Sequence, residues 1–184
     1  MQTKHKFVAL GLAAIMSFGA ASAIAQVKVG GAAMYPTKDI IDNAVNSKDH
    51  TTLVAAVKAA GLVDTLKSPG PFTVFAPTNK AFAALPKGTV DTLLKPENKG
   101  MLSGILTYHV VAGNMDAAAL TKAIAAGGGK AILKTVAGGE LMATVKGKKV
   151  LITDEKGGTA TVTIANVYQS NGVIHVVNKV LLPK

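Results

Sequence analysis

The chain has 184 residues, 49% of them hydrophobic, which is enough for one domain with a core of ordinary size. It has no cysteine, so disulfides and a cysteine-linked lipid anchor are excluded. The formal net charge is +10, every basic residue is lysine, and only 4% of residues are aromatic. Nucleic-acid readers depend on the bidentate fork of arginine and on aromatic stacking, so this composition argues against a nucleic-acid partner.

The N-terminus is typical of an export signal. Residues 4–6 are basic, residues 7–18 form an apolar stretch too short to span a bilayer, and Ala23 and Ala25 precede Gln26 as a small-x-small cleavage site. We therefore predict a signal peptide at residues 1–25 and secretion to the periplasm or the extracellular space. No later segment is long and apolar enough for a transmembrane span.

The glycine- and alanine-rich residues 26–35 are predicted to be a flexible lead-in, followed by one domain at residues 36–184. The first half of this domain has mainly helical patterns. Apolar spacing, with N-cap candidates at Thr37, Thr78, Thr89 and Asp116 and a glycine stop at Gly61, predicts helices over residues 37–45, 50–60, 62–66, 79–85, 89–94, 96–107 and 116–127. Short strands are predicted at residues 72–75, which Pro77 would end, and at residues 108–111.

From residue 131 the apolar period changes to two. Strands are predicted at residues 131–136, 140–146, 148–153, 159–167 and 173–182, separated by glycine-containing turns. Asn171-Gly172 predicts a tight hairpin between the last two, and the near-continuous apolar run after it predicts a central strand. Helices followed by strands in this way indicate an α+β fold.

Three segments carry a family resemblance. They are residues 72–82 (FTVFAPTNKAF), residues 106–111 (LTYHVV) and residues 171–183 (NGVIHVVNKVLLP). In this order and spacing the chain resembles the fasciclin domain family. The resemblance implies a compact β-sandwich or wedge with several helices packed on its N-terminal side, and an extracellular adhesion role without enzymatic activity. In animal relatives the tyrosine-histidine box is tied to integrin binding. Here it corresponds to Tyr108 and His109, and the chain has no Arg-Gly-Asp.

The positions of the histidines indicate structural roles rather than a catalytic or metal-binding site. In a regular strand Tyr108 and His109 would point to opposite faces, so one of them is expected in the core. His175, among apolar residues, is expected to be buried and neutral. With only His50, His109 and His175 after residue 25 and no cysteine, neither a metal site nor a cofactor is predicted. No Gly-x-Ser-x-Gly or phosphate-loop motif occurs, so no catalytic residue is assigned.

The sequence therefore predicts a secreted, non-enzymatic adhesion or binding module for cell-surface, matrix or protein–protein contacts, expected to be a monomer. One alternative is a basic protein that binds polyanions, either acidic polysaccharide or anionic lipid. A less favoured alternative is a periplasmic hydrolase that uses His109 or His175 as its base. The expected partner is an extracellular or envelope protein, or an acidic polysaccharide.

Two alternative locations are predicted for a partner-binding site. One is the Tyr108–His109 strand that the resemblance suggests. The other is a set of glycine-rich turns, expected together at one end of the sheet, with Lys146, Lys148, Lys149 and Lys156 on or beside them.

Overall fold

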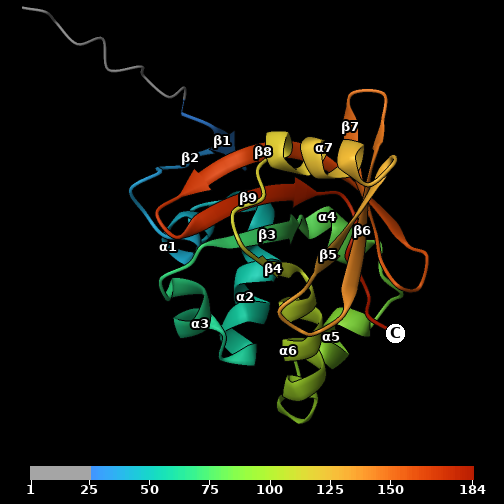
Figure 1. The fold of residues 1–184 in the computed structure, drawn as a ribbon. Coiled ribbons are helices and arrows are strands. Elements are labelled where there is room, and N and C mark those ends of the chain that lie inside the picture. The colour runs from blue at the N-terminus through green and yellow to red at the C-terminus, as the bar shows by residue number, and fades with distance from the viewer. Residues whose placement is uncertain (1–25) are drawn as a thin grey trace, which may run out of the picture.

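The computed structural model describes residues 26–184 (Figure 1). The predicted signal peptide at residues 1–25 lies outside the described residues. The main feature is a seven-stranded mixed sheet in the order β4-β3-β9-β8-β7-β6-β5. Its strands are β3 (Phe72–Pro77), β4 (Val110–Ala112), β5 (Lys130–Lys134), β6 (Glu140–Lys146), β7 (Lys149–Thr153), β8 (Thr159–Gln169) and β9 (Gly172–Val177).

Strand pairing nearly closes this sheet on itself. β3 and β9 are parallel, and all other neighbours are antiparallel. Strands β5 to β8 follow one another as a meander, and β9 returns into the centre. An isolated bridge between Val111 and Thr135, with a 2.8 Å hydrogen bond from the Val136 amide to the Val110 carbonyl, joins the two outer strands. The result is the predicted α+β fold, with a sheet that approaches a barrel.

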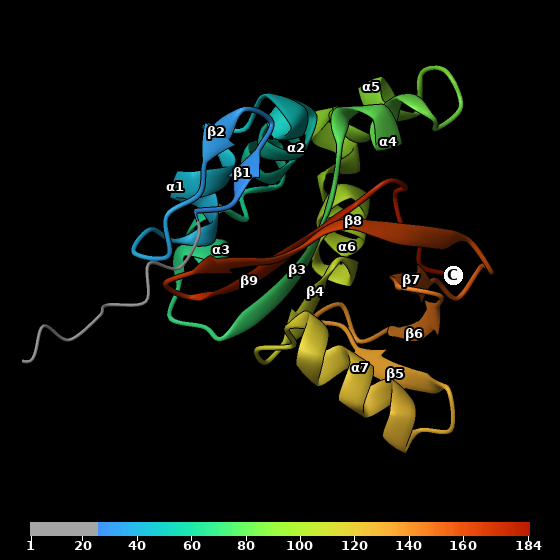
Figure 2. The same ribbon diagram turned by 90° about the horizontal axis from the view of Figure 1, so that it is seen from above.

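Helices lie on two sides of the sheet (Figure 2). They are α1 (Ile40–Ala44), α2 (Thr51–Ala60), α3 (Val63–Lys67), α4 (Asn79–Ala83), α5 (Thr89–Leu93), α6 (Lys99–Tyr108) and α7 (Ala117–Ala126), with short 3₁₀ turns at Lys48–His50 and Pro96–Asn98. In Figure 2, α1, α2 and α3 lie on one side of the central strands β3, β8 and β9, whereas α7 lies on the other side with β5 and β6.

Alternating side chains of the central strands supply two hydrophobic cores. Val74 of β3 and Ile174 of β9 face the core formed with α1, α2 and α6. Phe75, which follows Val74 on β3, and Val177 of β9 face the second core, which α7 closes with Leu120. Because β9 is buried on both faces along its whole length, the prediction of a central strand is confirmed.

Local capping signals are partly confirmed. The Thr78 hydroxyl accepts a hydrogen bond from the Ala81 amide at the start of α4, and Asp116 caps α7 through the Ala119 amide. Gly61 ends α2 in the left-handed conformation, with φ +72°. These residues act as the sequence predicts because each cap is satisfied within its own turn.

Two predicted caps are wrong. The N-cap of helix α1 is Asp39 rather than Thr37, because the Asp39 carboxylate accepts the Asp42 amide at 2.8 Å. Helix α5 contains Thr89 as its first residue, and Gly88, with φ +81°, precedes it without a side-chain cap. In each case the residue at the N-cap position lies one or two residues away from the expected threonine.

The prediction of a flexible lead-in is also wrong for most of residues 26–35. Strands β1 (Lys28–Val29) and β2 (Ala32–Ala33) form a two-residue hairpin, and Val29 and Met34 are buried in the core with α1 and α2. The apolar residues between the glycines give this segment enough burial to order it.

Candidate functional site

Tyr108 is a core residue rather than a surface contact. It is the last residue of α6 and is 0% exposed. Its hydroxyl donates to the Glu140 carbonyl at 2.8 Å and accepts from the Glu155 amide at 3.1 Å. Burial raises the pKa of Tyr108. The side chain thus joins the end of α6 to the β5–β6 and β7–β8 turns.

His109 is buried beside it, with 2% exposure, and both ring nitrogens are satisfied. The Leu181 amide donates to Nε2 at 2.9 Å, so Nδ1 carries the proton and donates to the Ile105 carbonyl at 2.8 Å. Burial lowers the pKa of His109 to about 4. A neutral ring therefore fixes the C-terminal segment to α6.

The prediction of a strand at residues 108–111 is corrected accordingly. Residue 108 is helical, His109 is the C-cap, and β4 begins only at Val110. The rule that neighbouring strand residues point to opposite faces does not apply to this pair, and both side chains lie inside. The tyrosine-histidine box therefore cannot touch a partner while the domain is folded.

The third histidine of the sequence analysis is also internal. His175 is 0% exposed and stacks on Phe75 with 5.7 Å between ring centroids. Its Nε2 donates to the Met115 carbonyl at 2.8 Å, and burial lowers its pKa. This confirms the expectation of a buried, neutral histidine. Neither His109 nor His175 hydrogen-bonds a carboxylate or meets solvent, so neither ring has the exposed base–carboxylate geometry that the hydrolase alternative assigned to it.

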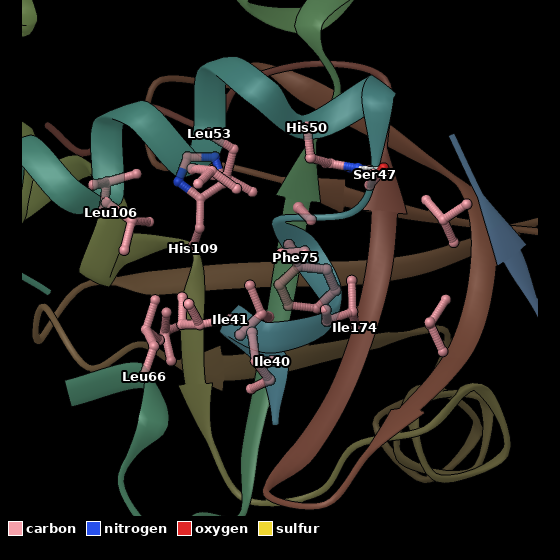
Figure 3. Close-up of a pocket in the computed structure, with 18 of the residues that line it drawn as sticks. Ile40, Ile41, Ser47, His50, Leu53, Leu66, Phe75, Leu106, His109 and Ile174 are labelled. Carbon is pink, nitrogen blue, oxygen red and sulfur yellow. Dashed lines mark hydrogen bonds between the residues drawn. The ribbon is translucent and has the colours of Figure 1, made fainter. Parts of the chain in front are cut away.

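A small cavity lies between α1, α2 and the sheet (Figure 3). It measures about 40 Å³ and its walls are almost entirely apolar, with Ile40, Leu53 and Ile174 among them. His50 lines it too: its Nδ1 lies 2.9 Å from the Ser47 hydroxyl, whereas its Nε2 has no hydrogen-bond partner. Burial lowers the pKa of His50, and the Ala76 backbone partly opposes this effect. At this size the cavity is a packing defect of the core, far below the volume of a ligand pocket.

The predicted lysines do lie on the surface, but in two separate places. Lys146 and Lys149 form the last pair of the β6–β7 ladder, and Lys148 follows Gly147 in the turn between them. All three side chains are exposed. We call Lys146, Lys148 and Lys149 the lysine hairpin. Within residues 26–184, ion pairs involve only Lys67 and Lys95, so no carboxylate neutralises the lysine hairpin.

Lys156 lies at the opposite end of the strands. In a meander, successive turns alternate between the two ends, so the β6–β7 turn cannot share an end with the β5–β6 and β7–β8 turns (Figure 1). The expectation that the glycine-rich turns gather at one end is therefore wrong. Lys156 also has Asp154 and Glu155 beside it, and the Asp154 carboxylate accepts the Leu182 amide at 3.0 Å. This turn anchors the C-terminal segment.

A surface groove adjoins the lysine hairpin, between α7 and strands β7 and β8. It has a volume of about 390 Å³ and is lined by Ala117, Thr121, Lys148, Lys149, Val150, Val162, Thr163 and Ala165. We call it the lysine groove. Sequence reasoning missed it because helix α7 and the two strands are brought together only by tertiary packing.

A bulge in β8 shapes the wall of the lysine groove. The β8–β9 register shifts twice between Val162 and Val167, and Asn166 adopts a left-handed conformation with φ +59°. The Asn166 side chain accepts the Ala117 amide at 2.7 Å, which holds the start of α7 against the bulge. Bulges of this kind redirect side chains along a strand.

Two other features, a metal-binding cluster and a membrane-spanning helix, are absent from residues 26–184. Residues 26–184 contain no cluster of three or more histidine or acidic side chains able to hold a metal ion. Over the same residues, no helix has both the length and the apolar character needed to cross a bilayer.

Comparison with known proteins places the chain in a family. The fasciclin domain matches residues 48–183. The chain is 50% identical to "Protein sll1483" of Synechocystis over 84% of its own length and 79% of that protein, and 37% identical to the immunogenic protein MPT70 of Mycobacterium tuberculosis over 76% and 66%.

Two further matches cover only part of a longer chain. The chain is 37% identical to the pig transforming growth factor-beta-induced protein ig-h3, covering 80% of this chain and 20% of that protein. A FAS1 domain pair from the insect cell adhesion molecule Fasciclin I shares the fold, with a TM-score of 0.71, 18% identity, and coverage of 79% of this chain and 51% of that one. The chain belongs to the fasciclin domain family.

Proposed function

We propose that this protein is a secreted, non-enzymatic binding module that attaches to an acidic partner in the envelope or matrix through the lysine hairpin. Family membership supports an adhesive role, since a domain pair of the same fold comes from a protein described as a cell adhesion molecule. The site, however, differs from the one that the family's tyrosine-histidine box suggests, because Tyr108 and His109 are buried.

The observation that carries the proposal is the cluster of three exposed ammonium groups without a carboxylate beside them. Lys146 and Lys149 are directly opposed across the ladder, and Lys148 lies between them in the turn. Their potentials add on a projecting hairpin, where they attract a negatively charged surface over about a Debye length, roughly 8–10 Å at physiological salt. Such steering raises association rates with acidic partners more than with neutral ones.

The test compares attachment of three purified proteins to envelope and matrix fractions of the source organism. They are the wild type, a variant with Lys146, Lys148 and Lys149 changed to glutamine, and a control variant. In the control, three exposed lysines from the mainly helical first half of the domain are changed to glutamine. The control lysines are Lys58, Lys80 and Lys87, which remove the same net charge.

The proposal expects attachment to fall steeply with added salt, and to be lost in the hairpin variant but retained in the control variant. Equal losses in both variants would indicate a nonspecific effect of net charge. Unchanged attachment in the hairpin variant would show that the contact lies elsewhere on the domain. Melting temperatures of all three proteins establish that the fold is intact.

A further inference from the structure

We propose that the lysine groove binds a carboxylated sugar, so that the acidic partner is a polysaccharide containing uronic acid. This inference rests on the proposed function and specifies its ligand. It depends on three independent features: the charge arrangement of the hairpin, the chemistry of the groove lining, and the lack of anchor residues for a protein partner.

The charge arrangement works against stability in the free protein. Like charges directly opposite each other in a ladder are destabilising, and Lys146 and Lys149 occupy such a pair. No acidic side chain relieves the repulsion within residues 26–184. A bound carboxylate near the hairpin would relieve it, so the arrangement is better suited to a ligand complex than to the free fold.

The groove lining suits one face of a sugar ring. Lys148 and Lys149 supply ammonium donors, and Val150 and Val162 supply apolar lining against which ring C–H groups can pack. A volume of about 390 Å³ lies within the roughly 300–1,000 Å³ of small-ligand sites.

Two threonines add hydrogen-bonding capacity for sugar hydroxyls. The Thr121 hydroxyl donates to the Ala117 carbonyl at 2.7 Å, and the Thr163 hydroxyl donates to the Val176 carbonyl at 3.2 Å. Each hydroxyl proton is thus engaged, but each oxygen keeps lone pairs that can accept from a ligand O–H. The groove therefore offers cationic donors for a carboxylate and neutral acceptors for hydroxyls.

Asp116 lies beside the groove residue Ala117 at the start of α7, and its carboxylate is already hydrogen-bonded within the domain. Its carboxylate accepts the Ala119 amide at 2.8 Å and the Tyr168 hydroxyl at 3.1 Å. The bond from the Ala119 amide is the main reason that the pKa of Asp116 is lowered. The carboxylate therefore stabilises the N-terminus of the helix instead of pairing with the lysines.

An acidic protein fits the groove less well. Protein interfaces concentrate binding energy in buried tryptophan, tyrosine and arginine anchors, and none of these residues lines the groove. The whole chain has no arginine, so neither a phosphate nor a carboxylate can be held by a bidentate fork. A lysine ammonium acts as a point charge toward either group, so vesicles with phosphate headgroups are a necessary comparison in the test.

The test uses hexameric oligogalacturonate as probe and its methyl ester as a matched neutral ligand. The key variant is Thr121→Tyr, which fills the groove from an exposed position on α7 without changing the net charge. We expect the wild type to bind oligogalacturonate saturably, with binding at least about tenfold weaker for the ester and for Thr121→Tyr, equivalent to the loss of one charge-assisted contact. Thr163→Ser, which keeps the hydroxyl, should bind like the wild type.

Polyglutamate of similar length and vesicles containing phosphatidylglycerol separate this inference from the proposed function. If Thr121→Tyr weakens binding of oligogalacturonate but not of polyglutamate or the vesicles, the groove recognises the sugar. If the ester binds as well as the acid, the carboxylate is not what the groove recognises and the inference is refuted. If Thr121→Tyr has no effect while the hairpin variant weakens every polyanion equally, the sugar site is refuted and the lysine hairpin remains a general acidic contact. If the hairpin variant retains all binding, the proposed function fails as well.

Discussion

Replacing His109 with glutamine should make the domain markedly less sensitive to acid. In the folded protein the His109 ring is neutral, because the Leu181 amide donates to Nε2 and the surroundings are apolar. Its pKa of about 4 lies well below the ordinary histidine value of 6.5. Between these two pH values the His109 side chain is therefore protonated in the unfolded chain but neutral in the folded protein.

The sign follows from that difference in proton binding. When the unfolded state binds more protons, stability rises with pH, so it is lost as the pH falls through the window from about 6.5 to about 4. At about 1.4 kcal/mol for each pH unit, this linkage removes about 2.5 kcal/mol from the free energy of unfolding between pH 7.5 and pH 4.5. That is a large part of the roughly 5–15 kcal/mol that stabilises a domain.

Urea unfolding followed by far-ultraviolet circular dichroism at pH 7.5 and pH 4.5 measures the effect. At pH 7.5 His109→Gln should be less stable than wild type by about 1–3 kcal/mol, because glutamine replaces the ring's two hydrogen bonds imperfectly. On going to pH 4.5, the variant should lose about 2.5 kcal/mol less than wild type.

His50 and His175, whose pKa values are also lowered by burial, remain in both proteins, and so the difference between the two acid losses isolates His109. Equal acid losses in wild type and variant would refute the reasoning, since His109 would then exchange no proton on unfolding.

Three further predictions concern the core, the β8–β9 turn and the lysine hairpin. Phe75→Ala and Phe82→Ala should each lower the free energy of unfolding by about 3–5 kcal/mol, since both rings are buried; a loss below about 1 kcal/mol would contradict their core position. Asn171→Ala should cost about 2–3 kcal/mol in the same urea assay, because three hydrogen bonds to the helical layer are lost; a near-neutral result would mean that solvent replaces them. Lys149→Glu should raise the melting temperature by about 1–3 °C while weakening attachment to acidic surfaces, as a cross-strand repulsion becomes an attraction. A lower melting temperature in that variant would show that the lysine pair is not a source of strain.

The sequence predicts this fold well where the signal is local. Thr78, Gly61 and Asp116 act within a single helical turn, and the period-two alternation from residue 131 comes from side chains of one strand. Each of these signals is complete within about ten residues, so tertiary contacts change only the precise ends of the elements.

The β8–β9 turn was predicted correctly, but for the wrong reason. Neither Asn171 nor Gly172 has a positive φ angle. The Asn171 side chain instead accepts the Ile40 amide and donates to the Leu66 and Ser68 carbonyls, which ties the turn to α1 and α3. Gly172 is required because a β-carbon would lie 2.1 Å from the Phe72 carbonyl oxygen. Both requirements come from residues 100 or more positions away, where no local pattern can reveal them.

The site was harder to predict than the fold. Val110–Ala112 is a three-residue strand that follows α6 after one residue, His109, and the largely apolar residues across the junction carry no signal for where the helix ends. The separation of Lys156 from the lysine hairpin, by contrast, follows from the predicted meander itself, because alternate turns of a meander lie at opposite ends. The lysine groove requires α7 to pack on β7 and β8, which the sequence did not indicate.

The final prediction distinguishes the residues by which the family is recognised from the residues that we propose bind the partner. The tyrosine-histidine box lies inside and the lysine hairpin lies outside, so stability and attachment should respond to different substitutions. Tyr108→Phe removes the hydroxyl that accepts the Glu155 amide and should cost about 1–3 kcal/mol of stability, yet leave attachment unchanged at a temperature where the variant is folded. The three lysine-to-glutamine changes should abolish attachment without lowering the melting temperature. Combining both sets should give the sum of the two effects, because sites without shared contacts behave additively. Loss of attachment in folded Tyr108→Phe would show instead that the box shapes the binding surface, and that the family motif has a role in recognition after all.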